Sequence, residues 1–201
     1  MAGVRLIAGL GNPGPRYADT RHNVGARLVR SLAGRFGIRL VSEGRFKGEL
    51  GRGDILGHDV RLLLPETYMN LSGDSVGAVA QFYKIPSNGI LIAYDEMAFE
   101  PGIVRFRIGG GANGHNGLSS VIAGLGNDGE FPRLRIGVGH PGSRDQVTAY
   151  LTSVRMPQSE RELVDRACDL TDAVWSDLLD GNWSKVMNQL HAPDTAGGTG
   201  E

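Results

Sequence analysis

The chain has 201 residues, with 21 basic and 22 acidic side chains and a formal net charge of −1. This length predicts one domain, and the charge balance excludes a strongly basic nucleic-acid coat protein. The single cysteine, Cys168, excludes an intramolecular disulfide framework and a multi-cysteine zinc site. We find no apolar run of the ~18 residues that a membrane span requires, and no signal peptide. We therefore expect a cytoplasmic protein.

The charged side chains are unevenly distributed along the chain. Residues 21–62 carry nine basic and four acidic side chains, whereas residues 145–180 carry three and eight. Arginine accounts for 18 of the 21 basic residues, and its planar fork suits phosphate. We expect the first segment to face a polyanion and the second to point elsewhere.

The first third of the chain predicts a strand, a helix and a group of short strands. Val4–Leu10 is apolar, and the turn-rich sequence GNPGP that follows it predicts a rigid loop. A helix is expected from an N-cap at Thr20 to Gly37. Alternating runs separated by glycines predict further strands at 38–41, 48–55 and 60–64.

The middle of the chain predicts the same alternation of helices and strands. Ser72 or Asp74 is expected to cap a helix, which leads to a buried strand over 90–94 that ends at Asp95. A strand over 103–108 places two arginines on one face. The glycine-rich sequence GGGANGHNG at 109–117 then leads into a helix over 118–125.

The last third predicts one more strand, at 134–138, followed by helices. An apolar stripe from Leu163 to Leu178 predicts a single long amphipathic helix, and a shorter helix is expected over 183–190. Residues 192–201 are expected to form a disordered tail. The fold class predicted is α/β, with a single domain over 1–191 whose mixed, mostly parallel, twisted sheet is flanked by helices.

Three familiar types of site do not fit the sequence. Gly9-x-Gly11-x-x-Gly14 matches the dinucleotide pattern, but Pro15 follows it and no helix begins before Thr20. The Gly-x-Ser-x-Gly sequence of a serine hydrolase is missing, and a buried structural role is the better interpretation of Cys168. A metal site made of His22, Asp95 and His115 is chemically possible, but their spacing matches no ligand pattern.

Polar side chains gather where strands end and helices begin. His22 lies in the first turn of its helix, where the macrodipole disfavours a protonated imidazole, as suits a general base. Asp95 can orient that ring and stabilise the imidazolium. Asn12 and Asn70 can donate N–H groups to a developing oxyanion. These residues indicate a hydrolase or transferase.

The same residues belong to motifs that resemble those of the bacterial-type peptidyl-tRNA hydrolases, from Gly9 to about His191. The motifs are GLGNPG at 9–14, YxxTRHNxG at 17–25, PxTYMNxSG at 65–73, DEM at 95–97, GGGxxGHNGL at 109–118, RxRIGxG at 133–139 and NxLH at 188–191. Agreement at so many separated places makes the resemblance specific.

The resemblance implies a hydrolase that needs no metal or cofactor and cleaves the ester between peptide and tRNA, which releases tRNA after premature ribosomal drop-off. It implies that His22 is the catalytic base and Asp95 its partner. The substrate-binding residues that it implies are Asn12, Tyr17, Met69, Asn70, His115 and Asn116, with Arg105 and Arg135 as a clamp on the tRNA 5′-phosphate. A monomer with no obligate protein partner and no membrane association is expected.

Three positions depart from the usual pattern of the family. Arg30 stands where an acid is usual, Ala98 where a second aspartate is common, and Ser119 where a basic residue usually follows the HNGL sequence. Ala98 removes a second carboxylate, and Ser119 removes one phosphate contact. The alternative from another class is an RNA-binding module without catalysis, which would need no working His22–Asp95 pair.

Overall fold

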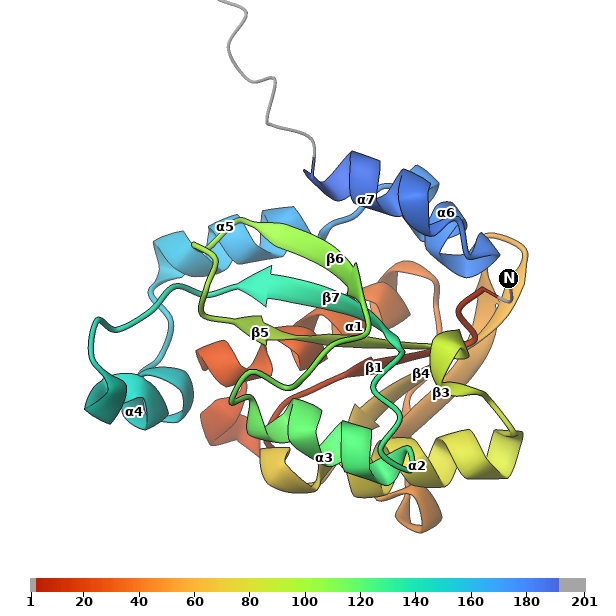
Figure 1. The fold of residues 1–201 in the computed structure, drawn as a ribbon, viewed down its shortest axis with the longest axis horizontal. Coiled ribbons are helices and arrows are strands. Elements are labelled where there is room, and N and C mark those ends of the chain that lie inside the picture. The colour runs from red at the N-terminus through yellow and green to blue at the C-terminus, as the bar shows by residue number, and fades with distance from the viewer. Residues whose placement is uncertain (1–2, 192–201) are drawn as a thin grey trace, which may run out of the picture.

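Seven strands form one twisted sheet at the centre of the molecule (Figure 1). The computed structural model describes residues 3–191. The strand order is β2-β3-β4-β1-β5-β7-β6. The strands are β1 (Leu6–Gly9), β2 (Val41–Glu43), β3 (Gly48–Ile55), β4 (His58–Pro65), β5 (Ile90–Glu96), β6 (Val104–Ile108) and β7 (Pro132–Gly137).

The centre of the sheet is parallel and its margins are antiparallel. Strand β1 pairs in parallel with β4 and β5, and β5 pairs in parallel with β7. Strands β2 and β3 on one side, and β6 on the other, run antiparallel to their neighbours. The α/β fold with a mixed sheet is therefore confirmed, and the carboxyl ends of β1, β4 and β5 meet at one edge, where such folds bind ligands.

Helices cover both faces of the sheet (Figure 1). On one face α1 (Val24–Arg35) packs with α5 (Gln158–Cys168), α6 (Asp172–Asp180) and α7 (Trp183–His191) in the larger apolar core. On the other face α2 (Ser72–Tyr83) and α3 (Asn116–Gly124) enclose a second core. A short helix, α4 (Val147–Thr152), lies beside the carboxyl edge of the sheet, and its residues were not predicted to be helical.

The single long C-terminal helix of the prediction is wrong, because the chain breaks between α5 and α6. Asp169 ends α5, and the Thr171 hydroxyl oxygen accepts the N–H of Val174 at 3.4 Å to begin α6. Leu163 is exposed, although its position fits the apolar stripe. Cys168 lies at the end of a helix, half-buried. Burial raises the pKa of its thiol to about 12, which agrees with its exclusion as a nucleophile.

The predicted side-chain caps also differ from the structure. Helix α2 has no side-chain cap, because Ser72 donates its hydroxyl proton to the Met69 carbonyl at 2.7 Å and Asp74 pairs with Lys47 at 2.9 Å. The Thr20 hydroxyl donates to the Tyr17 carbonyl and begins a short 3-10 turn, Arg21–Asn23, rather than α1 itself. Both differences arise because nearby carbonyls and cations compete for these short polar side chains.

The prediction that the acidic segment points away from the basic segment is wrong. Arginines around α1 reach across to acids of α5 and α6 and form ion pairs with them. The pairs are Arg21–Glu160 (2.7 Å), Arg27–Asp165 (2.7 Å) and Arg35–Asp172 (2.5 Å). Because the two segments pack against each other, much of this basic charge is paired within the protein, and the partner carboxylates compete with a polyanion for it.

The ends of the chain are not part of this description. The predicted tail, 192–201, lies outside the described residues, and the boundary of the domain at residue 191 stays a prediction. Among residues 3–191, the helices are all too short or too polar to cross a bilayer.

Candidate active site

A contact between two backbones brings α1 close to the end of β5. A Cβ atom on Gly25 would lie 2.1 Å from the Ala93 carbonyl oxygen, and one on Gly9 would lie 2.3 Å from the Gly25 carbonyl oxygen. Only glycines allow strands and helix to approach this closely. The approach places the turn before α1 beside the carboxyl end of β5, and so places His22 beside Asp95.

One buried carboxylate binds two histidines. The Nδ1 atom of His22 lies 2.9 Å from Oδ1 and 2.8 Å from Oδ2 of Asp95. The Nε2 atom of His115 lies 2.8 Å from Oδ1 of the same residue. The Asp95 side chain is 1% exposed. The two imidazole rings are tilted, with centroids 5.0 Å apart.

The hydrogen bonds assign a tautomer to each neutral ring. The Nδ1 atom of His115 accepts the backbone N–H of Leu118 at 3.1 Å, so its proton is on Nε2 and is donated to Asp95. A carboxylate can only accept, so His22 donates from Nδ1. Its Nε2 therefore carries a lone pair, for which we find no donor among residues 3–191. This is the arrangement of a general base.

The Asp95 carboxyl group stays ionised in spite of its burial. Burial alone raises its pKa, but the positive charge that His115 or His22 carries when protonated, together with the hydrogen bonds that both rings donate, outweighs burial and holds the pKa well below its usual value. The ligand atoms of these three residues lie within 4.8 Å of one another, a set that could also hold a metal ion. Both nitrogens that face the carboxylate donate protons to it, however, and this arrangement fits proton transfer without a metal.

Hydrogen bonds with Asn23 and Met69 fix the position of Asn12. Its backbone N–H donates to Asn23 Oδ1, and Asn23 Nδ2 donates to the Asn12 carbonyl, each at 2.9 Å. Its side-chain oxygen accepts the N–H of Met69 at 2.8 Å. Asn70 and Asn116 are exposed, in the short 3-10 turn Met69–Leu71 directly before α2 and at the first residue of α3. Met69 is buried against the other residues of this edge.

The histidine–aspartate cluster opens into a cleft of about 530 Å³. One wall is the loop that precedes α3, with Asn113, His115 and Asn116, and the opposite wall is α4. The cleft is also lined by Glu96 and Met97 of the DEM motif, and by residues that no sequence motif marked, which are His140, Arg144, Val147, Thr148, Leu151 and Thr152. The last four lie in α4, whose short helical pattern gave no signal in the sequence.

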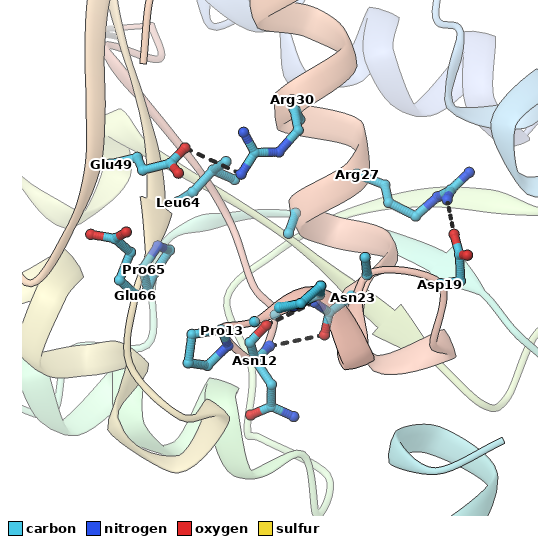
Figure 2. A pocket seen from close by; sticks show the side chains of 15 residues that line it. Asn12, Pro13, Asp19, Asn23, Arg27, Arg30, Glu49, Leu64, Pro65 and Glu66 are labelled. Carbon is cyan, nitrogen blue, oxygen red and sulfur yellow. Dashed lines mark hydrogen bonds and ion pairs between the residues drawn. The ribbon is translucent and has the colours of Figure 1, made fainter. Parts of the chain in front are cut away.

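Asn12 lines a different hollow, of about 430 Å³, between α1 and the end of β4 (Figure 2). Figure 2 shows the Asn12–Asn23 pair beside Pro13, with Arg27 and Arg30 extending from α1. Arg30 pairs with Glu49 at 3.2 Å, so the basic residue that departs from the family pattern is neutralised across this hollow. The structure thus groups His22, Asp95, His115 and Asn116 in one cleft and places Asn12 in the other hollow.

Comparison with known proteins assigns the family. The sequence model of the family described as peptidyl-tRNA hydrolase matches residues 6–197. The chain belongs to the peptidyl-tRNA hydrolase family. The peptidyl-tRNA hydrolases of Pseudomonas paraeruginosa and Azotobacter vinelandii are 49% and 48% identical to it over 192 residues, which cover 96% of this chain and 98% of each relative. The crystal structure of peptidyl-tRNA hydrolase from Acinetobacter baumannii has a TM-score of 0.91 and 46% identity, and covers 96% of both chains.

The two arginines that the hydrolase resemblance assigns to a phosphate clamp lie opposite each other. Arg105 of β6 and Arg135 of β7 are direct partners in the sheet. Arg105 Nη1 donates to the Leu190 carbonyl at 2.8 Å, and Arg135 pairs with Glu96 at 3.0 Å. Both guanidinium groups therefore have partners within the protein that compete with a phosphate.

Arg107 lies on the same face as this pair, as the alternation over 103–108 predicts, although the resemblance assigns the clamp to Arg105 and Arg135. Its side chain is exposed, and we find no ion pair for it among residues 3–191. Alternate residues of a strand point to the same face, so the position of Arg107 two residues after Arg105 indicates from the sequence that it lies on this face.

The other positions that the hydrolase resemblance singles out are Tyr17, Ala98 and Ser119. Tyr17 is half-buried, its hydroxyl accepts a hydrogen bond from Arg16, and the Arg16 guanidinium lies 4.4 Å above its ring. Ala98 donates its backbone N–H to Glu96 Oε1 at 3.1 Å and its side chain is exposed, as is that of Ser119. Neither departure touches the histidine–aspartate cluster.

Proposed function

We propose that this protein hydrolyses the ester bond between the peptide and the tRNA of peptidyl-tRNA, and thereby recycles tRNA in the cytoplasm, where translation releases this substrate. Family membership supports the reaction class. The observation that carries the proposal is that Nε2 of His22, a residue that lines the cleft, has no hydrogen-bond donor within residues 3–191, while Nδ1 is held by Asp95.

In this mechanism His22 acts as a general base on water. Nε2 takes a proton from a water molecule while the water oxygen attacks the ester carbonyl, and Asp95 stabilises the imidazolium that forms. The tetrahedral intermediate then collapses, the C–O bond to the ribose breaks, and the imidazolium returns the proton to the ribose oxygen. The products are a peptide with a free carboxylate and tRNA with a free hydroxyl. A positioned base contributes about 10²–10⁴-fold to the rate.

The asparagines supply N–H donors for the carbonyl oxygen of the substrate. Asn12 keeps its side-chain NH₂ group available, because its oxygen is bound to Met69. Asn70 and Asn116 are exposed at the same edge of the sheet and can contact the peptide or the tRNA 3′ end. Tyr17 and Met69 would form part of that surface, whereas His115 would act by orienting Asp95.

The tRNA acceptor arm would lie along the arginine-bearing face of β6 and β7. Arg135 would bind the 5′-phosphate in exchange for Glu96, and Arg105 would join this clamp only by releasing the Leu190 carbonyl. Arg107 adds an exposed cation to this face. No cofactor or protein partner enters the mechanism, and a monomer is sufficient for it.

The test is peptide release from N-blocked aminoacyl-tRNA by protein treated with a chelator. Hydrolysis should persist without metal, and His22→Ala should lose most of the turnover while tRNA binding, measured separately, is retained. A wild-type protein that binds tRNA but releases no peptide would be an RNA-binding module instead. A metal requirement would indicate that His22, Asp95 and His115 hold an ion.

A further inference from the structure

A buried arginine on β7 has no role in the mechanism above. Arg133 is 1% exposed. Its Nη1 donates to the Gly111 carbonyl at 2.7 Å, and its Nη2 donates to the Gly129 carbonyl at 3.0 Å and to the Gly110 carbonyl. The guanidinium carbon lies 4.6 Å from the centre of the Phe131 ring. The side chain thus joins the glycine-rich loop after β6 to the segment that enters β7.

This cation is stabilised without a counter-ion. Among residues 3–191 no carboxylate lies within ion-pair distance of Arg133. Burial lowers the pKa of its guanidinium, since the charged form is desolvated. Burying a charge without an opposite charge is costly. Only arginine has a planar fork that can donate to several carbonyl groups at once, and the carbonyl groups that bind it here belong to the glycine-rich loop and the segment before β7.

The loop it holds has little regular structure of its own. Backbone φ is positive at Gly109 (+68°), Gly110 (+104°), Asn113 (+49°) and Gly114 (+80°). Repeated left-handed residues cannot form a strand or helix, so external hydrogen bonds must fix the path of the loop. Arg133 supplies such bonds at residues 110 and 111, a few residues before His115.

The end of this loop is part of the proposed active site. Its last residue, His115, binds Asp95 and accepts the N–H of Leu118 as the N-cap of α3. Asn116 follows as the first residue of α3, and residues 112–116 form one wall of the cleft. The loop is therefore fixed at one end by Arg133 and at the other by Asp95, and a shift at the first end moves the wall.

We propose that Arg133 is a positioning residue that fixes the cleft wall, and with it His115 and Asn116, through the carbonyl groups of the glycine-rich loop. The proposal rests on the proposed function, because its activity readout is hydrolysis. The two arginines of β7 would thus have different roles. Arg135 would contact the tRNA, and Arg133 would fix the glycine-rich loop through its carbonyl groups.

The test compares Arg133→Met and Arg133→Lys on two substrates. One is N-acetylaminoacyl-tRNA, and the other is the same N-acetylaminoacyl ester on a CCA trinucleotide, which lacks the acceptor stem and its 5′-phosphate. Displacing catalytic groups by about 1 Å costs about 10²-fold, so we expect kcat to fall by that order on both substrates for Arg133→Met. Arg52→Met, which removes a surface guanidinium from β3, is the matched control and should change neither rate.

The lysine variant separates geometry from charge. Lysine keeps the positive charge but cannot span the same carbonyl groups as a planar fork, so we expect only partial recovery. Full activity of Arg133→Lys, or a loss by Arg133→Met that is confined to the tRNA substrate, would mean that Arg133 acts through its charge on the RNA. Either result would overturn the proposal.

Hydrogen exchange supplies a readout that does not depend on hydrolysis. We expect the backbone amides of residues 109–115 to exchange faster in Arg133→Lys than in the wild type, with amides of β1 and β5 unchanged. Unchanged exchange in the loop would contradict the proposal even if Arg133→Met fails to fold. If the wild-type protein hydrolyses neither substrate, the proposed function fails, and the exchange experiment still decides whether Arg133 holds the loop.

Discussion

Asn12 accepts the backbone N–H of Met69 through its side-chain oxygen, at 2.8 Å. Since a backbone nitrogen can only donate, the atom that faces Met69 is Oδ1, and the NH₂ group is directed away from it. The bond joins the loop after β1 to the loop after β4 across the carboxyl edge of the sheet. It orients two N–H donors before any substrate is present, as an oxyanion site requires.

The first prediction concerns this orientation. Asn12→Asp keeps an oxygen for the Met69 N–H but replaces the donors by a negative charge, so the fold should persist while the oxyanion loses its partner. We expect kcat to fall by about 10²–10³-fold, with the melting temperature close to that of the wild type. Steady-state hydrolysis and thermal unfolding check both parts. A normal kcat would remove Asn12 from oxyanion stabilisation.

The second prediction concerns the glycine that lets α1 approach β5. A Cβ atom at Gly25 would lie 2.1 Å from the Ala93 carbonyl oxygen, so Gly25→Ala should push α1 away and separate His22 from Asp95. We expect a loss of about 1–3 kcal/mol in the free energy of unfolding, together with a lower kcat. Gly34→Ala is the control in the same helix, because its Cβ would meet nothing within 4 Å. It should stabilise the protein by about 0.5–1 kcal/mol.

The third prediction concerns acid stability. His115 and His22 outweigh burial and hold the pKa of Asp95 below its ordinary value of 3.8. A lowered pKa in the folded state means that the unfolded chain binds the proton more readily, so this stabilisation is present above about pH 3.8 and is lost as the pH falls below it.

Urea unfolding between pH 5 and pH 3 measures this effect. The free energy of unfolding of the wild type should decline across the lower part of this range. Asp95→Asn should be less stable at neutral pH but should decline less steeply, because the group that titrates is gone. Equal slopes for the two proteins would show that Asp95 does not contribute to acid unfolding.

The fourth prediction separates the arginines of β6. Arg107 is exposed without an ion pair among the described residues, whereas Arg105 donates to the Leu190 carbonyl. We expect Arg107→Ala to raise KM for tRNA substrates and to reduce the slope of log kcat/KM against log salt by about one. Arg105→Ala should change the slope less and lower the melting temperature more, since it loosens α7. The reverse order would place the main phosphate contact at Arg105.

Most secondary structure followed from local patterns in the sequence. Alternating apolar residues predicted the strands that became β3, β4 and β6, and apolar runs predicted those that became β5 and β7. The patterns failed where a local signal was ambiguous, as in the apolar stripe from Leu163 to Leu178. Apolar residues have the same spacing whether they lie on one long helix or on two successive helices that face the same core. The stripe therefore does not reveal the break at residues 169–171.

The sequence by itself determined the residue types and order of the candidate site: a histidine before a helix, an aspartate at a strand end, and asparagines in the connecting loops. Only the tertiary structure decided which side chains meet. It joined His22 and His115 to one carboxylate, paired the arginines of α1 with acids of α5 and α6, and buried Arg133 under the glycine-rich loop. The physical reason is that periodicity specifies the conformation and face of each residue, whereas a hydrogen bond or ion pair depends on distances between segments that are far apart in the chain.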